Sequence, residues 1–492
     1  MSSTPPPGPT TSSTPDDVAP DDGDSTHGAG ASGVEPSGRL GHGLKVRHLT
    51  MMGLGSAIGA GLFLGTGQGI RTAGPAILLS YAIAGVIVIL VMRMLAEMAA
   101  AVPSSGSFST YAEVAIGRWA GFTLGWVYWF TLIMVLGVEI TGASMIINGW
   151  LPGVPPWVIA LVLVLFFAAV NLLGVRSFGE FEFWFAALKV AVIVVFLVVG
   201  TLLALGVLPG TDPVGVSNLV GHGGFAPTGI AGVATGLLVV VFAFGGIEII
   251  TIAAAESDDP ERSIAKAARS IVWRILLFYI GSVAIMVLVL PWDSPELLAG
   301  PFVAVLGLAK LPALPAIMEV VVVVALLSAF NANVYGTSRM AFSLAQRGDG
   351  PRGLLRVSRH EIPVVAVLVS IVFALVSVLL NWLLPERLLG ILLNAVGASL
   401  IGIWVMIAVS QIRLRRRLET AGRLTVRMWG FPWLSWFTLA LLAGLVALML
   451  TDGAARAQAL STTLLFAVVA GIFFLTQLLR ARSARKATPT PR

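Results

Sequence analysis

Cysteine is absent from this 492-residue chain, so disulfide bonds, thiolate metal sites and cysteine nucleophiles are excluded. Charged residues are also scarce, at 11%, whereas hydrophobic residues make up 57% and the mean hydropathy is +0.92. A chain with so little charge and so much apolar surface does not fold as a set of soluble domains. The composition is typical of an all-α polytopic membrane protein.

Histidine is rare in the same way, because all five histidines lie outside the long apolar segments or at their edges. This argues against an intramembrane histidine relay or a zinc site, and we expect no metal. No Gly-x4-Gly-Lys-Ser/Thr phosphate loop is present either, which argues against direct use of ATP. We expect no cofactor, and any energy that this chain uses would come from an ion gradient or from exchange.

Residues 1–44 are rich in Pro, Ser, Thr, Gly and Asp and contain no apolar run. They predict a disordered cytosolic tail rather than a signal peptide. Between residues 45 and 480, apolar segments alternate with turn residues or charges, and residues 481–492 form a second expected cytosolic tail. The segments predict about twelve transmembrane helices, centred near residues 58, 87, 134, 166, 194, 241, 280, 327, 372, 400, 441 and 470.

Basic residues orient these segments. With a cytosolic amino terminus, the outer loops hold only Arg71, Lys310, Arg387 and Arg456. The inner loops hold many more: Arg118, Arg176, Arg262, Lys266, Arg269, Arg274, Arg347, Arg352, Arg356, Arg359, Arg413, Arg415, Arg416, Arg417, Arg423 and Arg427. This asymmetry predicts that both termini are cytosolic, and it explains the net charge of +6 by topology rather than by nucleic-acid binding.

The first apolar segment carries glycine at six positions within residues 53–67. Glycine in a helix interior costs about 1 kcal/mol relative to alanine, and Gly59 and Gly61 fall near mid-depth. One explanation is an unwound turn whose backbone N–H and C=O groups face a cavity. The other is close helix packing, since Gly55/Gly59 and Gly61/Gly65 both have small-xxx-small spacing.

The sixth apolar segment contains a second interruption, Phe242-Ala-Phe-Gly-Gly246. Glycine-interrupted spans at matching places in two halves of a chain are typical of a transporter whose binding site lies at the bilayer midplane. The amino end of a half-helix attracts a carboxylate, and freed carbonyls accept an ammonium or a cation. This second interruption favours the unwound interpretation of the first.

Lys189 lies in the fifth apolar segment, about nine residues beyond Glu180 and so roughly 13 Å into a core about 30 Å thick. Burial at that depth disfavours the charged form, which makes Lys189 our first candidate for a proton-coupling group. The alternative is a permanently charged ammonium that replaces a structural sodium ion and ties the fifth helix to carbonyls of the first.

Other polar groups also fall within the apolar segments. Glu139 either faces a substrate amino group, carries a proton or pairs within the bundle. Glu248 either lines the site or holds the second interruption by accepting backbone N–H bonds, and we favour the second role. Arg93 and Glu97, four residues apart, can pair on one helix face and are interpreted as inner-end structure or gate. Interhelical hydrogen bonding explains a polar patch in the eighth segment: Ser328, Asn331, Asn333, Tyr335 and Ser338.

A series of motifs occurs in order along the chain: Gly55–Phe63, Met92–Met98, Gly106–Tyr111, Gly117–Gly121, Gly179–Trp184 before Lys189, Ala255–Ser257, Ser338–Met340 and Arg347–Asp349. Together they resemble the bacterial amino acid transporter family of the amino acid, polyamine and organocation superfamily. The resemblance covers residues 44 to 480. Within the family the chain looks most similar to 4-aminobutyrate (GABA) permeases, with proline and aromatic amino acid permeases next.

The resemblance implies a leucine-transporter-like fold. Two inverted five-helix repeats would span about residues 45–210 and 225–415, followed by two extra helices at about 430–480. It also implies proton-coupled import of an amino acid across the cytoplasmic membrane.

Residue by residue, the resemblance places the substrate carboxylate at backbone N–H groups of Ala57, Ile58, Gly59, Ala60 and Gly61. The substrate ammonium would meet carbonyls of Phe242, Ala243, Phe244 and Gly245. Lys189 matches a fifth-helix lysine that in relatives takes the place of a sodium ion and is implicated in proton coupling. Glu139 matches a third-helix acid of the family.

We therefore expect a proton symporter that works by alternating access, with an amino acid, protons and the lipid bilayer as its partners. One alternative is an exchanger that swaps an amino acid for a related amine without net proton flow. Another is an intramembrane enzyme, which would require paired mid-span aspartates, a serine with a histidine, or a metal cluster. The deep ionisable groups are instead scattered singly, so we expect no enzyme.

Overall fold

The structure, a computed structural model, describes residues 58–487 except for 105, 174, 249–250, 252–258, 360–361, 385–387 and 452. Throughout these described residues the chain forms helices and their connections, with no strand. The predicted tail at 1–44 and Ala57 lie outside them. The last helix runs to Ala487, so the first residues of the predicted tail at 481–492 are helical, and their place in the cytosol stays a prediction.

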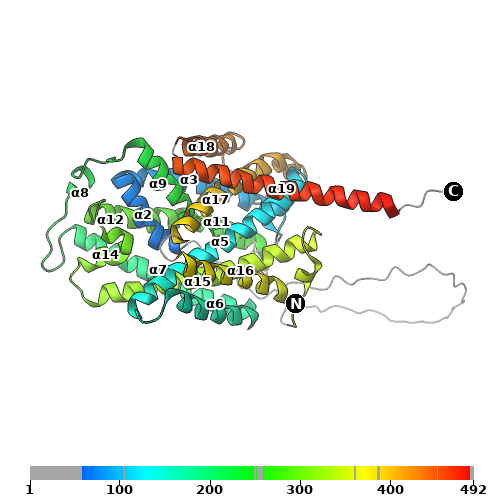
Figure 1. Cartoon of the computed structure of the whole chain (residues 1–492). Helices are drawn as coiled ribbons and strands as arrows, with labels where there is room; N and C mark the ends of the chain where they lie inside the picture. The colour runs from blue at the N-terminus through cyan, green and yellow to red at the C-terminus, as the bar shows by residue number, and fades with distance from the viewer. Residues whose placement is uncertain are drawn as a thin grey trace, which may run out of the picture. The chain divides into compact units, whose positions relative to one another are not determined.

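The first part of the chain contains three long helices, α3, α5 and α7, and several short ones (Figure 1). In order the elements are the π-helix η1 (Gly61–Gly65), α2 (Thr66–Ala73), the 3₁₀ turn η2 (Gly74–Ala76), α3 (Ile77–Ala101), α4 (Ser107–Ala115), α5 (Arg118–Trp150), α6 (Pro156–Leu173), α7 (Val175–Ala204), α8 (Ser217–Val220) and α9 (Gly229–Ala243).

The second part is built on α15, α17 and α19, which are the longest helices there (Figure 1). Its elements are α11 (Pro260–Arg274), the π-helix η3 (Ile275–Ile280), α12 (Gly281–Val289), α13 (Glu296–Ala299), α14 (Pro301–Gly307), α15 (Ala313–Gln346), the 3₁₀ turn η4 (Arg352–Leu355), α16 (Val364–Leu383), α17 (Leu388–Thr420), α18 (Trp433–Met449) and α19 (Gly453–Ala487).

Seven helical stretches among the described residues are long and apolar enough to cross a membrane, and four shorter helices are also apolar. The stretch Gly61–Ala101 is 41 residues long, or about 60 Å of helix, which is twice the thickness of a bilayer core. It is divided where α2 ends at Ala73 and η2 begins at Gly74, which has a φ of 65° and is followed by Pro75. The number of twelve spans stays a prediction.

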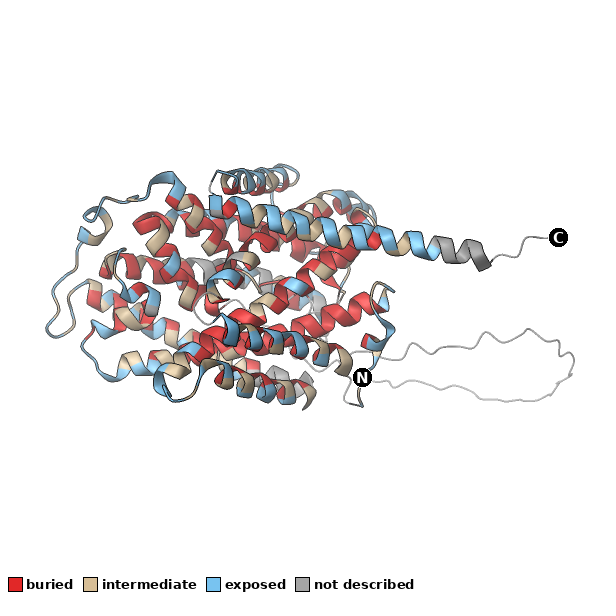
Figure 2. Cartoon of the chain, in the orientation of Figure 1, coloured by how far each residue is buried: buried red, intermediate tan, exposed pale blue. Residues whose placement is uncertain are grey.

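The centre of the molecule is formed by α5, which packs against both α15 and α17. Residues of α5 and α15 are buried over most of their length, whereas the apolar window of α19 is only 6% buried (Figure 2). Because α19 keeps apolar side chains such as Leu464 and Leu475 exposed, its surface suits contact with lipid rather than water. The polar groups buried among α5, α7, α9 and α15 are therefore the candidates for a site.

Candidate functional site

The two glycine-containing interruptions meet inside the molecule. The helix α9 ends at Ala243, and residues 244–248 form a turn in which Gly246 has a φ of 92°. On the other side, the π-helix η1 begins at Gly61. A Cβ atom added to Gly61 would overlap the Cα atom of Ala243, so the missing side chain lets the two backbones touch.

The contacts around these glycines distinguish between the two explanations of the glycine run, an unwound turn and close helix packing. Gly61 is a close-approach position, but a Cβ atom on Gly65 would have its nearest neighbours at 3.7 Å or beyond, which is ordinary van der Waals contact. The Gly61/Gly65 pair is therefore not a packing motif of the small-xxx-small kind. The close approach at Gly61 is to the interrupted end of α9, where a helix stops.

A small cavity of about 20 Å³ lies between the two interruptions. It is lined by Gly59, Gly61, Val135, Glu139, Phe242, Ala243, Gly245 and Asn333. A space of this size holds about one water molecule. Any larger guest requires the lining residues to move apart.

Glu139 of α5 reaches this cavity and caps the start of the helix that contains η1. Its two carboxylate oxygens lie 3.2 and 3.1 Å from the backbone nitrogen of Ala60. A Cβ atom on Gly59 would lie 2.5 Å from Glu139 Oε1, so glycine leaves the space that the carboxylate fills. Glu139 thus occupies one of the N–H groups that the sequence assigned to a substrate carboxylate.

Lys189 and Glu182 form a buried charge pair on α7. Lys189 Nζ lies 4.0 Å from Glu182 Oε1, and both side chains are fully buried. Ser328 of α15 donates a hydrogen bond of 2.9 Å to the other oxygen, Glu182 Oε2. The sequence reasoning missed Glu182, although its place seven residues before Lys189 puts it on the same helix face two turns away.

Glu248 binds to the backbone of the second interruption and to α17. Its Oε2 accepts the N–H of Gly246 at 3.0 Å, and its Oε1 accepts the indole N–H of Trp404 at 2.7 Å. This is the geometry of the turn-holding alternative, and Glu248 does not line the 20 Å³ cavity.

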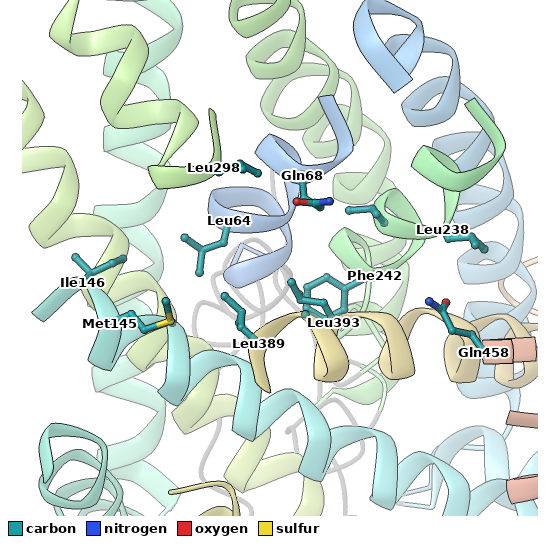
Figure 3. A pocket seen from close by; sticks show the side chains of 13 residues that line it. Leu64, Gln68, Met145, Ile146, Leu238, Phe242, Leu298, Leu389, Leu393 and Gln458 are labelled. Atoms are coloured by element: carbon teal, nitrogen blue, oxygen red, sulfur yellow. The ribbon is translucent and has the colours of Figure 1, made fainter. Parts of the chain in front are cut away.

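Phe242 also borders a larger space of about 510 Å³, which we call the vestibule (Figure 3). Figure 3 shows Leu64, Gln68, Leu389 and Leu393 around it, with the ring of Phe242 between α9 and α17. Phe242 lines both this vestibule and the small cavity. Its ring is therefore the boundary between them.

The predicted residues divide into those the structure gathers at the cavity and those it does not. Gly59, Gly61, Glu139, Phe242, Ala243 and Gly245 line it. Ile58 and Ala60 are buried next to it, without lining it. Phe244 packs instead against Tyr279 and Tyr81, with ring centroids 4.7 and 6.0 Å away. Val135 and Asn333 were missed: Val135 lies one turn before Glu139, and Asn333 was assigned to interhelical bonding.

The inner-end pair differs from the expectation. Glu97 forms its ion pair with Arg415 of α17, not with Arg93. It also accepts hydrogen bonds from Gln411 Nε2 at 2.7 Å and from the N–H of Met428 at 2.5 Å. Arg93 also binds to the segment between α17 and α18, because its Nε donates a hydrogen bond of 2.9 Å to the carbonyl of Arg427. Both residues thus attach α3 to the segment between α17 and α18.

A second polar cluster surrounds the turn after α15. Arg347 Nη1 lies 2.8 Å from Glu113 Oε2, and Arg118 Nη2 lies 3.3 Å from Asp349 Oδ1. Burial raises the pKa of the Asp349 carboxyl, and the neighbouring guanidinium groups of Arg347 and Arg118 partly offset that rise. The cluster joins α4 and the start of α5 to the end of α15.

Comparison with known proteins gives consistent matches over almost the whole chain. The family model described as Amino acid permease matches residues 48–488. The aromatic amino acid transport protein AroP of Corynebacterium glutamicum is 56% identical over 442 residues, which cover 89% of this chain and 95% of that protein. The gamma-aminobutyric acid permease of Bacillus subtilis is 43% identical over 452 residues, covering 91% and 96%. The corresponding permease of Escherichia coli is 43% identical over 428 residues, covering 87% and 92%.

Proposed function

Because the chain belongs to the amino acid permease family and is a multi-pass membrane protein, we propose that it imports an amino acid by proton symport with alternating access. The family and the relatives above are transporters, so amino acid transport rather than enzymatic chemistry is the function to which the fold is suited. The observation that carries the site is the small cavity between two interrupted helices, which the ionisable side chain of Glu139 lines.

For the substrate we propose an aromatic amino acid first and GABA second. The sequence motifs alone placed GABA permeases first, but identity is 56% with the aromatic transport protein against 43% with the GABA permeases. Val135 and Phe242 give the cavity two apolar walls. When the lining opens, such walls suit an aromatic side chain better than the unbranched chain of GABA.

For binding, the helix that starts at Gly61 offers its amino end to the substrate carboxylate, and the end of α9 offers carbonyls to the ammonium. Glu139 already holds the N–H of Ala60. The carboxylate of the substrate therefore binds the neighbouring backbone groups or displaces Glu139 from that N–H.

For alternating access, Phe242 is the outer boundary of the site. In this closed arrangement its ring separates the cavity from the vestibule of about 510 Å³. We propose that the vestibule faces the outside of the cell, in line with both termini lying in the cytosol and two inverted repeats at about 45–210 and 225–415. Displacement of the ring admits substrate from that side.

For proton coupling, Lys189 is the central group. It interacts electrostatically with both Glu182 and Glu139, and Glu139 in turn contacts the cavity backbone. A proton that moves on or off this group changes the charge beside the site, and substrate binding responds to that charge. The alternative role, in which a permanently charged Lys189 ties helices together, predicts no such response.

Uptake into proteoliposomes containing the purified chain tests the proposal. Accumulation of labelled L-phenylalanine into empty vesicles under an imposed inward proton gradient supports symport. Uptake that requires amino acid or amine inside the vesicles, and ignores the gradient, would establish the exchanger instead. Competition by unlabelled L-tyrosine, L-tryptophan, GABA, L-proline and L-lysine then ranks the substrates, and stronger competition by GABA than by L-tyrosine would reverse our order.

A further inference from the structure

Asn333 stands out among the cavity residues because one end of its amide is unused. It lies on α15, is 2% exposed and lines the cavity together with Gly59, Gly61 and Glu139. Its Nδ2 donates to the carbonyl of Ala329 at 2.8 Å, one helical turn earlier. Among the described residues, its Oδ1 has no hydrogen-bond partner.

The orientation of this amide follows from chemistry. A backbone carbonyl only accepts hydrogen bonds, so the end of the amide next to Ala329 must be the NH₂ group. The other end is therefore the oxygen, an acceptor. A buried acceptor without a partner costs about 1–3 kcal/mol, and such a group in a native structure requires an explanation.

Nearby polar residues of α15 differ from Asn333 in their surroundings. Asn331 accepts a hydrogen bond of 2.8 Å from Asn171 of α6 through its Oδ1, which is an interhelical contact, and it does not line the cavity. Thr337, one turn after Asn333, bonds through its hydroxyl to carbonyls of its own helix at 2.9 Å. Interhelical bonding thus accounts for Asn331 Oδ1, and the Nδ2 of that residue, although it has no hydrogen-bond partner among the described residues, belongs to a side chain that does not line the cavity; Asn333 Oδ1 belongs to one that does.

Two carbonyls at the end of α9 already accept backbone hydrogen bonds, and Asn333 Oδ1 adds a side-chain acceptor to the carbonyls that remain. The carbonyl of Phe242 accepts the N–H of Gly245 at 2.9 Å, and that of Val241 accepts the N–H of Phe244 at 3.2 Å. Resting on the proposed function, we propose that Asn333 Oδ1 accepts an N–H of the substrate's ammonium group. The ligand class is an amino acid with a protonated amine, and Asn333 is a side-chain ligand for the part of the substrate shared by all candidates.

The test compares ligands with and without the amine. Equilibrium binding of L-phenylalanine and of 3-phenylpropanoate to the full chain in nanodiscs gives the ratio of the two dissociation constants. Asn333→Leu, of similar size but without an acceptor, should lower this amine preference about 10-fold or more, since hydrogen bonds to charged groups are the strong ones. Asn333→Asp, which keeps an oxygen acceptor, should retain the preference, and so should the matched control Thr337→Val.

Three outcomes would overturn the assignment. If Asn333→Leu weakens the binding of both ligands equally, the residue shapes the cavity without binding the amine; if it changes neither dissociation constant, Asn333 does not contact the ligand. Both results leave amino acid binding by the wild type intact, and so leave the proposed function standing. GABA is tested in the same way, with butanoate as its deaminated analogue. If the wild type binds neither L-phenylalanine nor GABA, the proposed function fails and the assignment fails with it.

Discussion

The buried carboxylate at the inner end of α3 and the carboxylates at the centre of the molecule are surrounded in different ways. Glu97 accepts hydrogen bonds from Gln411, Arg415 and the backbone of Met428. Glu182 has Ser328 at 2.9 Å and Lys189 only at 4.0 Å, and within the described part of the chain its Oε1 has no hydrogen-bond partner. A carboxylate with several donors is fixed in place, whereas one with few donors can change partner or charge at lower cost.

The difference matches the positions of the two groups. The Glu97 network joins α3, α17 and the segment before α18, which are parts of the scaffold. The carboxylates at the centre of the molecule are Glu139 on α5 and Glu182 on α7, and Glu182 binds Ser328 on α15. Residues of α5 and α15 line the cavity, which must open for any amino acid to enter. We infer that the inner network serves stability and the central group serves transport, and four experiments test that division.

The largest effect is expected from Glu97→Ala. It removes the buried carboxylate paired with Arg415, which is 6% exposed, and leaves this guanidinium with the exposed carboxylate of Glu419 at 3.8 Å, so the free energy of unfolding should fall by about 3 kcal/mol. The melting temperature of the detergent-solubilised protein measures this. Glu113→Ala is the matched control, because its ion pair with Arg347 is partly exposed and should contribute about 1 kcal/mol or less. Equal losses of stability in the two variants would remove the contrast between fixed and changeable carboxylates.

Lys189→Ala should act on transport instead of stability. Because no proton can move on or off an alanine at this position, we expect gradient-driven uptake to fall about 10-fold or more, and equilibrium substrate binding at a fixed pH to fall far less than uptake does. Lys310→Ala, on the outer surface where Lys310 binds the carbonyl of Gly210, should leave both unchanged. Normal pH-driven accumulation by Lys189→Ala would contradict a coupling role. If substrate binding fell as much as uptake, the result would favour the alternative role, in which a permanently charged Lys189 ties helices together.

Gly59→Ala tests the cavity wall. The added Cβ atom, 2.5 Å from Glu139 Oε1, must push the carboxylate away from the N–H of Ala60. The new methyl group and the displaced carboxylate obstruct a cavity of only about 20 Å³, so we expect substrate affinity to fall about fivefold or more, and the lost bond between Glu139 and Ala60 should lower the melting temperature slightly. Gly65→Ala, whose new Cβ atom has ordinary contacts, should bind as the wild type does. Unchanged affinity in Gly59→Ala would show that this glycine serves packing alone.

The smallest effect is expected at Asp349, a third buried carboxylate, whose Oδ2 has no hydrogen-bond partner among the described residues. Because burial raises its folded-state pKa, its contribution to stability is complete below the unfolded pKa and is lost as pH rises through the folded value. Asp349→Asn removes this loss. The difference in unfolding free energy, variant minus wild type, obtained from the melting temperatures, should therefore increase by on the order of 1 kcal/mol or less as the pH rises from about 4 to about 7. A difference that is constant over this range would contradict the prediction.

The local features of the fold could be predicted from the sequence. Apolar segments and glycine interruptions act over a few residues, so the approximate spans and the meeting of Gly59 and Gly61 with Ala243 and Gly245 follow from them. The resemblance to amino acid transporters identified the family for the same reason, because it rests on motifs that are contiguous in the chain.

Long-range pairing could not be predicted in the same way. Arg415 lies 318 residues from Glu97, and nothing in either local sequence distinguishes that pairing from the nearer Arg93. Asn333 was grouped with Asn331 because both are polar, although the two side chains face different neighbours. Such contacts depend on how whole helices are rotated, which one sequence leaves open.

For the first interruption, the rotation of the helix is determined by the five residues of the π-helix η1, Gly61–Gly65. A π-helix accommodates one residue more per turn than an α-helix, and each residue of a helix turns the chain by about 100°. If one residue were deleted from Gly61–Gly65, the chain before it would swing by roughly that angle, carrying Gly59 and Ala60 away from Glu139 while every lining side chain stayed intact. A one-residue gap here, in an alignment of related permeases, would therefore mark proteins whose first interruption faces a different wall.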